Sequence, residues 1–123
     1  MPTPRQVSES YWNAECRRDI DGVMAHYHGD ATYEDGGGLR RGHAEVRRAY
    51  EASARDYPGL EVTIVREFTN GEDTSALEFD AVLIDHEGRR FRIRGVNVVH
   101  VRDGKFVSVR SYEDPPALEQ AVI

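Results

Sequence analysis

The chain has 123 residues, a common size for a single domain, and 39% of them are hydrophobic, which is enough for one core. We therefore expect one domain that spans residues 1–123. The formal net charge of -6 argues against nucleic-acid binding, because affinity for phosphates requires a basic face and the basic residues here are scattered pairs.

Cysteine usage and hydropathy give the expected location. Cys16 is the only cysteine and has no partner for an internal disulfide, as is typical of the reducing cytoplasm. The N-terminal residues show no charged segment followed by an apolar run, and no apolar stretch approaches the length of a membrane span. We expect a cytoplasmic protein that binds neither membranes nor nucleic acid.

The N-terminal residues are predicted to form a first helix. Thr3-Pro4-Arg5-Gln6 has the spacing of a capping box, with proline at the first helical position, so a helix is expected to begin there. Val7, Tyr11 and Ala14 then recur at helical spacing. This stripe directs the side chain of Tyr11 inward.

A second, short helix is expected to pair with the first as a hairpin. It should begin at Asp19 or Asp21 as N-cap and end near His28-Gly29. Its buried side is predicted to consist of Ile20, Val23, Met24 and Tyr27.

A strand over residues 31–35 is expected to follow. Alternate residues of a strand point to the same face, so Ala31, Tyr33 and Asp35 should lie together. Whatever buries Tyr33 should therefore approach Asp35. The three glycines at residues 36–38 predict a flexible loop.

The remainder is predicted to be one helix and a meander of strands. The helix is expected over residues 42–53, with Val46, Ala49, Tyr50 and Ser53 on one side. The strands are expected at residues 60–69, 75–85, 90–101 and 106–113, separated by hairpin signals at Asn70-Gly71, Glu87-Gly88 and Asp103-Gly104. Helices followed by antiparallel strands predict an α+β domain, with the helices gathered on one face of a curved sheet. The space between these layers is the natural pocket.

The hairpin between the second and third long strands decides where Asn97 points. A three-residue loop at residues 86–88 places Asn97 on the apolar face of its strand and sets Asp80 opposite Arg94 on the other face. A two-residue loop would flip one strand and bury Glu78 and Asp80 instead. The charge pair favours the three-residue loop.

The sequence resembles the nuclear-transport-factor-2-like superfamily, in its ketosteroid isomerase and SnoaL-like polyketide cyclase branch. The resemblance runs from Tyr11 through Asp114. It is carried by Tyr11-Trp12-Asn13-Ala14, Asp19-Ile20-Asp21-Gly22, Asp30-Ala31-Thr32-Tyr33-Glu34-Asp35 and Arg102-Asp103-Gly104-Lys105-Phe106-Val107. It implies a cone-shaped fold of N-terminal helices packed on a curved, mostly antiparallel sheet.

The resemblance also implies roles for three residues. Tyr11 occupies the position of the oxyanion-binding tyrosine of the isomerases, and Asp35 occupies that of the general base. The second oxyanion donor of that family is a protonated aspartic acid, where this chain has Asn97. An amide can donate through its NH2 group without a raised pKa. Because Asn97 replaces that acid, the strength of catalysis and the specificity for steroids do not follow from the resemblance.

The residues themselves fit proton transfer next to a carbonyl group, which needs a base near the carbon and donors near the oxygen. Each also has a purely structural interpretation. Asp35 could be a turn residue bonded to nearby backbone N–H groups, Tyr11 could be ordinary core, and Asn97 could be a buried amide with structural partners.

Other candidate sites are weaker. His26 and His28 are two residues apart, which separates their directions on a helix and argues against a metal site. The resemblance places Ser111 where epoxide hydrolases of the superfamily carry a catalytic aspartate. No phosphate-binding glycine loop or serine-histidine-acid arrangement is recognisable, so we expect no cofactor.

Two classes of function therefore remain open. One is an isomerase or cyclase that performs acid-base chemistry on a small apolar carbonyl-containing ligand. The other is a ligand-binding or dimerisation module without chemistry. Val82, Val96 and Val98 are expected on the outward face of the sheet, where the resemblance implies a homodimer.

Overall fold

The computed structural model describes residues 1–119. Within that range the helices are α1 (Pro4–Cys16), α2 (Ile20–Met24) and α3 (Gly42–Asp56). The strands of the first half are β1 (Tyr27–Asp35), β2 (Gly38–Arg41) and β3 (Gly59–Thr69). Those of the second half are β4 (Thr74–Ile84), β5 (Arg90–Arg102), β6 (Lys105–Glu113) and β7 (Ala117–Leu118).

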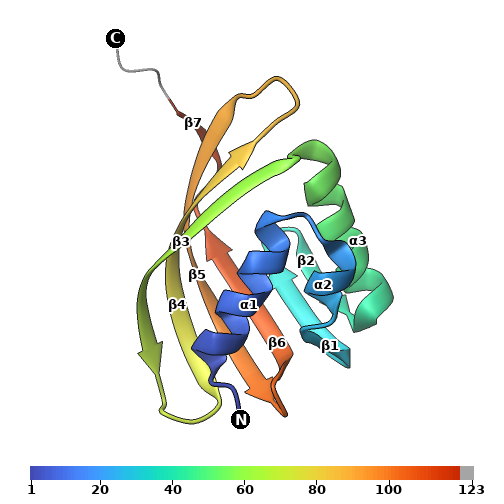
Figure 1. Cartoon of the computed structure of the whole chain (residues 1–123), viewed down its shortest axis with the longest axis vertical. Helices are drawn as coiled ribbons and strands as arrows, with labels where there is room; N and C mark the ends of the chain where they lie inside the picture. The colour runs from blue at the N-terminus through green and yellow to red at the C-terminus, as the bar shows by residue number, and fades with distance from the viewer. Residues whose placement is uncertain (120–123) are drawn as a thin grey trace.

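All the strands belong to one sheet with the order β2-β1-β6-β5-β4-β3, and β7 pairs with β5. The pairing of β1 with β6 is parallel, and every other pairing is antiparallel. The sheet curves around the helices: α1 lies against β3, β4 and β5, while α3 packs against β1 (Figure 1). This is the α+β architecture that the sequence predicts.

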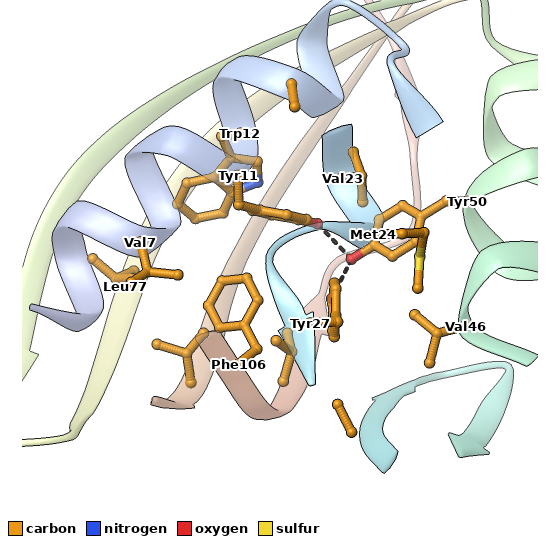
Figure 2. Packing of buried hydrophobic residues seen from close by; sticks show 14 of the residues in the cluster. Val7, Tyr11, Trp12, Val23, Met24, Tyr27, Val46, Tyr50, Leu77 and Phe106 are labelled. Carbon is orange, nitrogen blue, oxygen red and sulfur yellow. Dashed lines mark hydrogen bonds between the residues drawn. The ribbon is translucent and has the colours of Figure 1, made fainter. Parts of the chain in front are cut away.

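The hydrophobic core fills the space between α1, α2, α3 and the sheet (Figure 2). Aromatic rings dominate it on the side of β1 and β6, where Tyr11 packs against Phe106 with ring centroids 5.3 Å apart. The core residues below 2% exposure include Val23, Val46, Leu77 and Val109.

The predicted start of the first helix is confirmed. The hydroxyl group of Thr3 accepts a hydrogen bond from the Gln6 N–H at 3.1 Å, and the Thr3 N–H donates to Gln6 Oε1 at 2.9 Å. This reciprocal pair satisfies donors that the first turn leaves without partners. Val7, Tyr11 and Ala14 are all buried, as their spacing predicts.

The predicted end of the second helix is wrong. Asp19 caps the helix by accepting from the Gly22 N–H, but the helix ends at Met24 rather than near His28-Gly29. After Met24 the backbone pairs with β6 instead of continuing the helix: the Phe106 N–H donates to the His26 carbonyl, and Tyr27 pairs with Phe106. Tyr27 is buried as predicted, but from β1, which begins four residues before the expected strand.

The glycines at residues 36–38 form a tight hairpin instead of a flexible loop. Asp35 pairs with Gly38, so only Gly36 and Gly37 form the turn, and Gly38 has a φ of 118° that favours glycine. The strand that follows, β2, was not predicted, and neither was β7. The third helix begins at Gly42 as expected and extends to Asp56.

The three-residue hairpin between β4 and β5 is confirmed. Asp80 pairs with Arg94, and their side chains form an ion pair at 3.3 Å. Gly88 has the left-handed φ of 79° that the loop requires. Asn97 therefore points into the apolar side of the sheet and is only 5% exposed. No helix within residues 1–119 has the length and hydropathy needed to span a membrane.

Candidate active site

A cavity of about 120 Å³ lies between α1 and the sheet. Its wall combines apolar side chains from the long strands with a few polar groups. The polar and aromatic lining residues are Tyr11, Trp12, Glu15, Tyr33, Ser53, Phe79, Asn97, Ser111 and Glu113. Two of the three predicted site residues, Tyr11 and Asn97, therefore share one cavity.

Asn97 lines this cavity and has an unsatisfied polar atom. It occupies β5, where it pairs with Leu77 on one side and Ser111 on the other. Its Oδ1 is fully buried and forms no hydrogen bond with any residue in the range 1–119. A buried amide without partners is costly. The unpaired oxygen is an acceptor, and a half-turn of the amide would put the NH2 donors in its place.

Tyr11 belongs to a chain of three phenols (Figure 2). The hydroxyl group of Tyr50 lies 2.7 Å from that of Tyr11 and 2.5 Å from that of Tyr27. Burial raises the pKa of Tyr11 well above its ordinary value, so this phenol stays protonated at neutral pH. Because hydroxyl groups in a chain polarise one another, Tyr50 can strengthen Tyr11 as a donor.

Asp35 lies at the end of β1, outside the cavity that Tyr11 and Asn97 share. Its Oδ1 accepts a hydrogen bond from the Gly37 N–H at 2.7 Å and forms an ion pair with Arg40. Both bonds use Oδ1, which leaves Oδ2 as the oxygen that can accept a proton. The tight hairpin of β1 and β2 thus fixes the direction of the carboxylate.

A second cavity of about 140 Å³ lies beside the first and is lined by Asp35. It is lined by Asp35, Arg40, Ala49 and Tyr50 together with four residues that also line the first cavity. The shared residues are Glu15, Tyr33, Ser53 and Glu113. Asp35 and Asn97 therefore face adjoining spaces that a common set of side chains separates.

A larger depression of about 600 Å³ lies outside these two cavities. It is lined by the β1–β2 turn and the end of β6, including Asp35, Ser111 and Glu113. Ser111 also lines the first cavity, and Asp35 also lines the second. This depression is therefore the natural entrance for a ligand.

Glu15 is a buried carboxyl group that the sequence analysis missed. It is 7% exposed, and its Oε1 accepts a hydrogen bond from Arg18 Nη1 at 2.9 Å. Burial raises the pKa of Glu15 to about 7, against the opposing effect of Arg18. A signal was present: Glu15 follows Tyr11 by four residues, which places it on the same face of the helix.

Glu113 ends β6 beside Asp35, which ends the parallel strand β1. Its removal from water raises the pKa of Glu113, and the charge of Asp35 raises it further. Glu113 contributes to both cavities and to the entrance. Among residues 1–119, no group of three or more His, Cys, Asp or Glu side chains is arranged to hold a metal ion.

A family model described as the SnoaL-like domain matches residues 8–109, which is most of the chain. The chain belongs to the SnoaL-like domain family. None of the curated proteins matches its sequence.

Solved structures share the fold of this SnoaL-like domain. An LEH-like epoxide hydrolase from M. tuberculosis is 28% identical, with a TM-score of 0.75 over 88% of this chain and 80% of that chain. The Delta 5-3-ketosteroid isomerase from Mycobacterium sp. is 22% identical, with a TM-score of 0.76 over 86% of this chain and 88% of that one.

A nuclear-transport-factor-2-like protein from Burkholderia pseudomallei is 19% identical, with a TM-score of 0.79 over 93% of this chain and 92% of that chain. At the identities of the isomerase and of this protein, the likeness shows the fold alone. The nuclear-transport-factor-2-like fold expected for this SnoaL-like domain is thereby confirmed.

Proposed function

We propose that this SnoaL-like domain is an acid-base enzyme that moves a proton next to the carbonyl group of a small, largely apolar substrate. Asp35 is the base, and Tyr11 and Asn97 bind the carbonyl oxygen. The observation that carries the proposal is the buried Asn97 amide, whose Oδ1 has no partner, in the same cavity as Tyr11. After a half-turn of the amide, its NH2 group takes the place of this oxygen and can donate to a substrate oxygen.

The proposed oxygen site works by holding donors ready before the reaction. When a proton leaves the carbon next to a ketone, negative charge develops on the oxygen, and fixed donors stabilise that charge. Tyr11 donates its proton to the oxygen if Tyr27 donates to Tyr50 and Tyr50 to Tyr11. Asn97 donates through its NH2 group after a half-turn of the amide, which exchanges Oδ1 and Nδ2.

The size of the cavities limits the substrate. They measure about 120 and 140 Å³, whereas sites for drug-sized ligands measure roughly 300–1,000 Å³. A four-ring steroid exceeds this space in the present conformation. A monocyclic or short open-chain ketone fits better, so we propose a substrate of that size.

The test uses cyclohex-3-enone, whose isomerisation to cyclohex-2-enone produces conjugated-enone absorbance. We expect turnover by the natural protein and a loss of at least about a hundredfold in Asp35→Asn, because general-base catalysis contributes about that much. Asp30→Asn is the matched control, since Asp30 is an exposed aspartate of the same strand. Equal rates in the natural protein and Asp35→Asn would refute the assignment of the base.

A polyketide cyclase is the alternative with the same residues. Ring closure onto a carbonyl group begins with the same removal of a proton, and the entrance of about 600 Å³ offers room for a longer chain. A protein that binds ketones without turning over cyclic or open-chain substrates would instead be a binding module.

Epoxide hydrolysis receives less support. The M. tuberculosis protein is an epoxide hydrolase by its description. In this chain Ser111 occupies the position at which the sequence resemblance implies an aspartate, and a hydroxyl group is a poor base for activating water.

A further inference from the structure

Glu15 occupies a position that no other carboxyl group of residues 1–119 shares. It is buried on α1, one helical turn after Tyr11, and it lines both the cavity of Asn97 and the cavity of Asp35. Glu113 also lines both, but it lies at the exposed end of β6. Glu15 is thus a buried carboxyl group that borders both the cavity of Asn97 and the cavity of Asp35.

Arg18 holds this carboxyl group in place. Arg18 follows α1 with a φ of 54°, in the left-handed region that non-glycine residues rarely adopt. Its guanidinium group also donates to the Tyr57 carbonyl through Nε at 3.0 Å and Nη2 at 2.7 Å. The bond from Arg18 uses only Oε1 of Glu15, so the second carboxyl oxygen is not committed to it.

The surroundings of Glu15 determine when it holds a proton. Arg18 is its bonded partner. The other titratable groups that line its two cavities come from five elements: Tyr11 of α1, Tyr33 and Asp35 of β1, Arg40 of β2, Tyr50 of α3 and Glu113 of β6. Burial outweighs Arg18 and raises the pKa of Glu15 to about 7. Glu15 therefore exists in both protonation states near neutral pH.

We propose that Glu15 is a second proton-transfer group of this site, which donates a proton to the substrate while Asp35 accepts one. This inference rests on the proposed function. A single carboxylate could serve both carbons only by moving between them. Asp35 is tethered through Oδ1 to Gly37 and Arg40, so it is suited to serve one.

The proposed step balances in protons and electrons. A C–H bond next to the carbonyl group breaks, its electron pair forms the enolate, and Asp35 Oδ2 gains the proton. The O–H bond of Glu15 then breaks as a new C–H bond forms at the far carbon of the former double bond, and the ketone returns. One proton passes from Asp35 to Glu15 through solvent and restores both groups.

Isotope labelling distinguishes proton transfer by Asp35 alone from proton transfer by Asp35 and Glu15 together. In D2O, Glu15 exchanges its proton with solvent, so cyclohex-2-enone formed by the natural protein should carry deuterium at the newly protonated carbon. In Glu15→Gln, we expect kcat/KM to fall about tenfold or more and the remaining product to retain its own hydrogen. Glu9→Gln is the matched control because Glu9 is an exposed glutamate of the same helix. Products that retain their own hydrogen in the natural protein would overturn the role of Glu15.

A second measurement needs no turnover. The carboxyl carbon of Glu15 is followed by NMR as pH changes, with and without cyclohexanone, a ketone that cannot isomerise. We expect titration near pH 7 and a further rise in the Glu15 pKa when the ketone displaces water. If the Asn97 signals shift but the Glu15 titration does not, the oxygen site stands and the inference fails. If neither the Asn97 signals nor the Glu15 titration changes and no enone isomerises, both the proposed function and this inference are wrong.

A variant that lacks both members of the buried ion pair controls for destabilisation caused by an unpaired charge. Glu15→Gln leaves Arg18 without its charged partner, which can destabilise the protein. The double variant Glu15→Met/Arg18→Met removes both members. We expect it to lose deuterium incorporation in the same way, and incorporation at the level of the natural protein would overturn the inference.

Discussion

Asn97 of β5 lies directly opposite Ser111 of β6, and both side chains line the cavity that Tyr11 also lines. The pairing places a hydroxyl group and an amide side by side in the wall of this cavity. Their burial is a consequence of the strand register, because a shift by one residue would turn both to the opposite face. The register of the long strands therefore determines whether this protein has an oxygen site.

Replacing Asn97 should separate function from stability. We expect Asn97→Leu to abolish ketone binding and to leave the free energy of unfolding unchanged or raise it by about 1 kcal/mol, because it removes a buried unpaired oxygen. Urea denaturation and NMR titration with cyclohexanone measure the two effects. Asn13→Leu, at an exposed position of α1, should alter neither. Destabilisation of Asn97→Leu by more than about 2 kcal/mol would indicate a structural role for the amide.

The phenol chain gives a second prediction. Tyr50→Phe removes two hydrogen bonds and leaves the hydroxyl groups of Tyr11 and Tyr27 without their shared partner. We expect a loss of about 1–3 kcal/mol in the free energy of unfolding and a lower kcat on cyclohex-3-enone.

Tyr57→Phe is the control for Tyr50→Phe, because the contacts recorded for Tyr57 are made by its ring, against Phe91, and by its backbone, and Phe retains both. An activity of Tyr50→Phe equal to that of the natural protein would contradict the proposal that Tyr50 strengthens Tyr11 as a donor.

The buried carboxyl group predicts how stability depends on pH. The pKa of Glu15 is about 7 in the folded state and near 4.5 in the unfolded state, so the folded state binds more protons between these values. The contribution to stability is complete below pH 4.5 and is lost as pH rises through 7.

Between about pH 5 and pH 8, we expect Glu15 to lower the free energy of unfolding by about 2 kcal/mol. Urea denaturation at several pH values should show this decrease in the natural protein and a smaller one in Glu15→Gln. The difference between the two proteins isolates Glu15 from the other titrating groups. Parallel pH profiles would show that Glu15 has an ordinary pKa.

The sequence predicted more of the second half of the fold than of the first. The long strands are rich in β-branched residues, and each is bounded by a glycine-containing turn, so their positions and register follow from local signals. Near the N-terminus, Tyr27 fits the apolar stripe of α2 as well as it fits a strand. Only its pairing with Phe106, distant in sequence, decides between the two.

The candidate site was predicted in part. Tyr11 and Asn97 share a cavity because helical and strand periodicity both directed them inward. Glu15 was missed because an acidic residue on a helix is usually solvated. Its partner Arg18 has a positive φ just after the helix, which no local pattern predicts. The separation of Asp35 from Asn97 depends on side chains from α1, β1, α3 and β6, which no local pattern reveals.

The outward face of the sheet supports a prediction about assembly. We propose that the protein forms a homodimer through this face, where Val96 pairs with Tyr112 and the Tyr112 side chain is 56% exposed. Sedimentation at micromolar concentration should give twice the mass of the chain, and Val96→Asp should shift the protein toward monomers. Ala25→Asp, at an exposed position after α2, should not. A monomeric natural protein would refute the proposal.

The parallel pairing of β1 with β6 has a consequence for the order of folding. Tyr33 and Val109 are neighbours in the sheet although most of the chain separates them. Such long-range pairing is slow because a large loop must close first. A chain emerging from the ribosome can form α1, α3 and the β1–β2 hairpin early, yet it lacks Ser111 and Glu113 until β6 has been made. The candidate site is therefore incomplete until β6 has been made, so a nascent chain that ends before β6 lacks part of its lining.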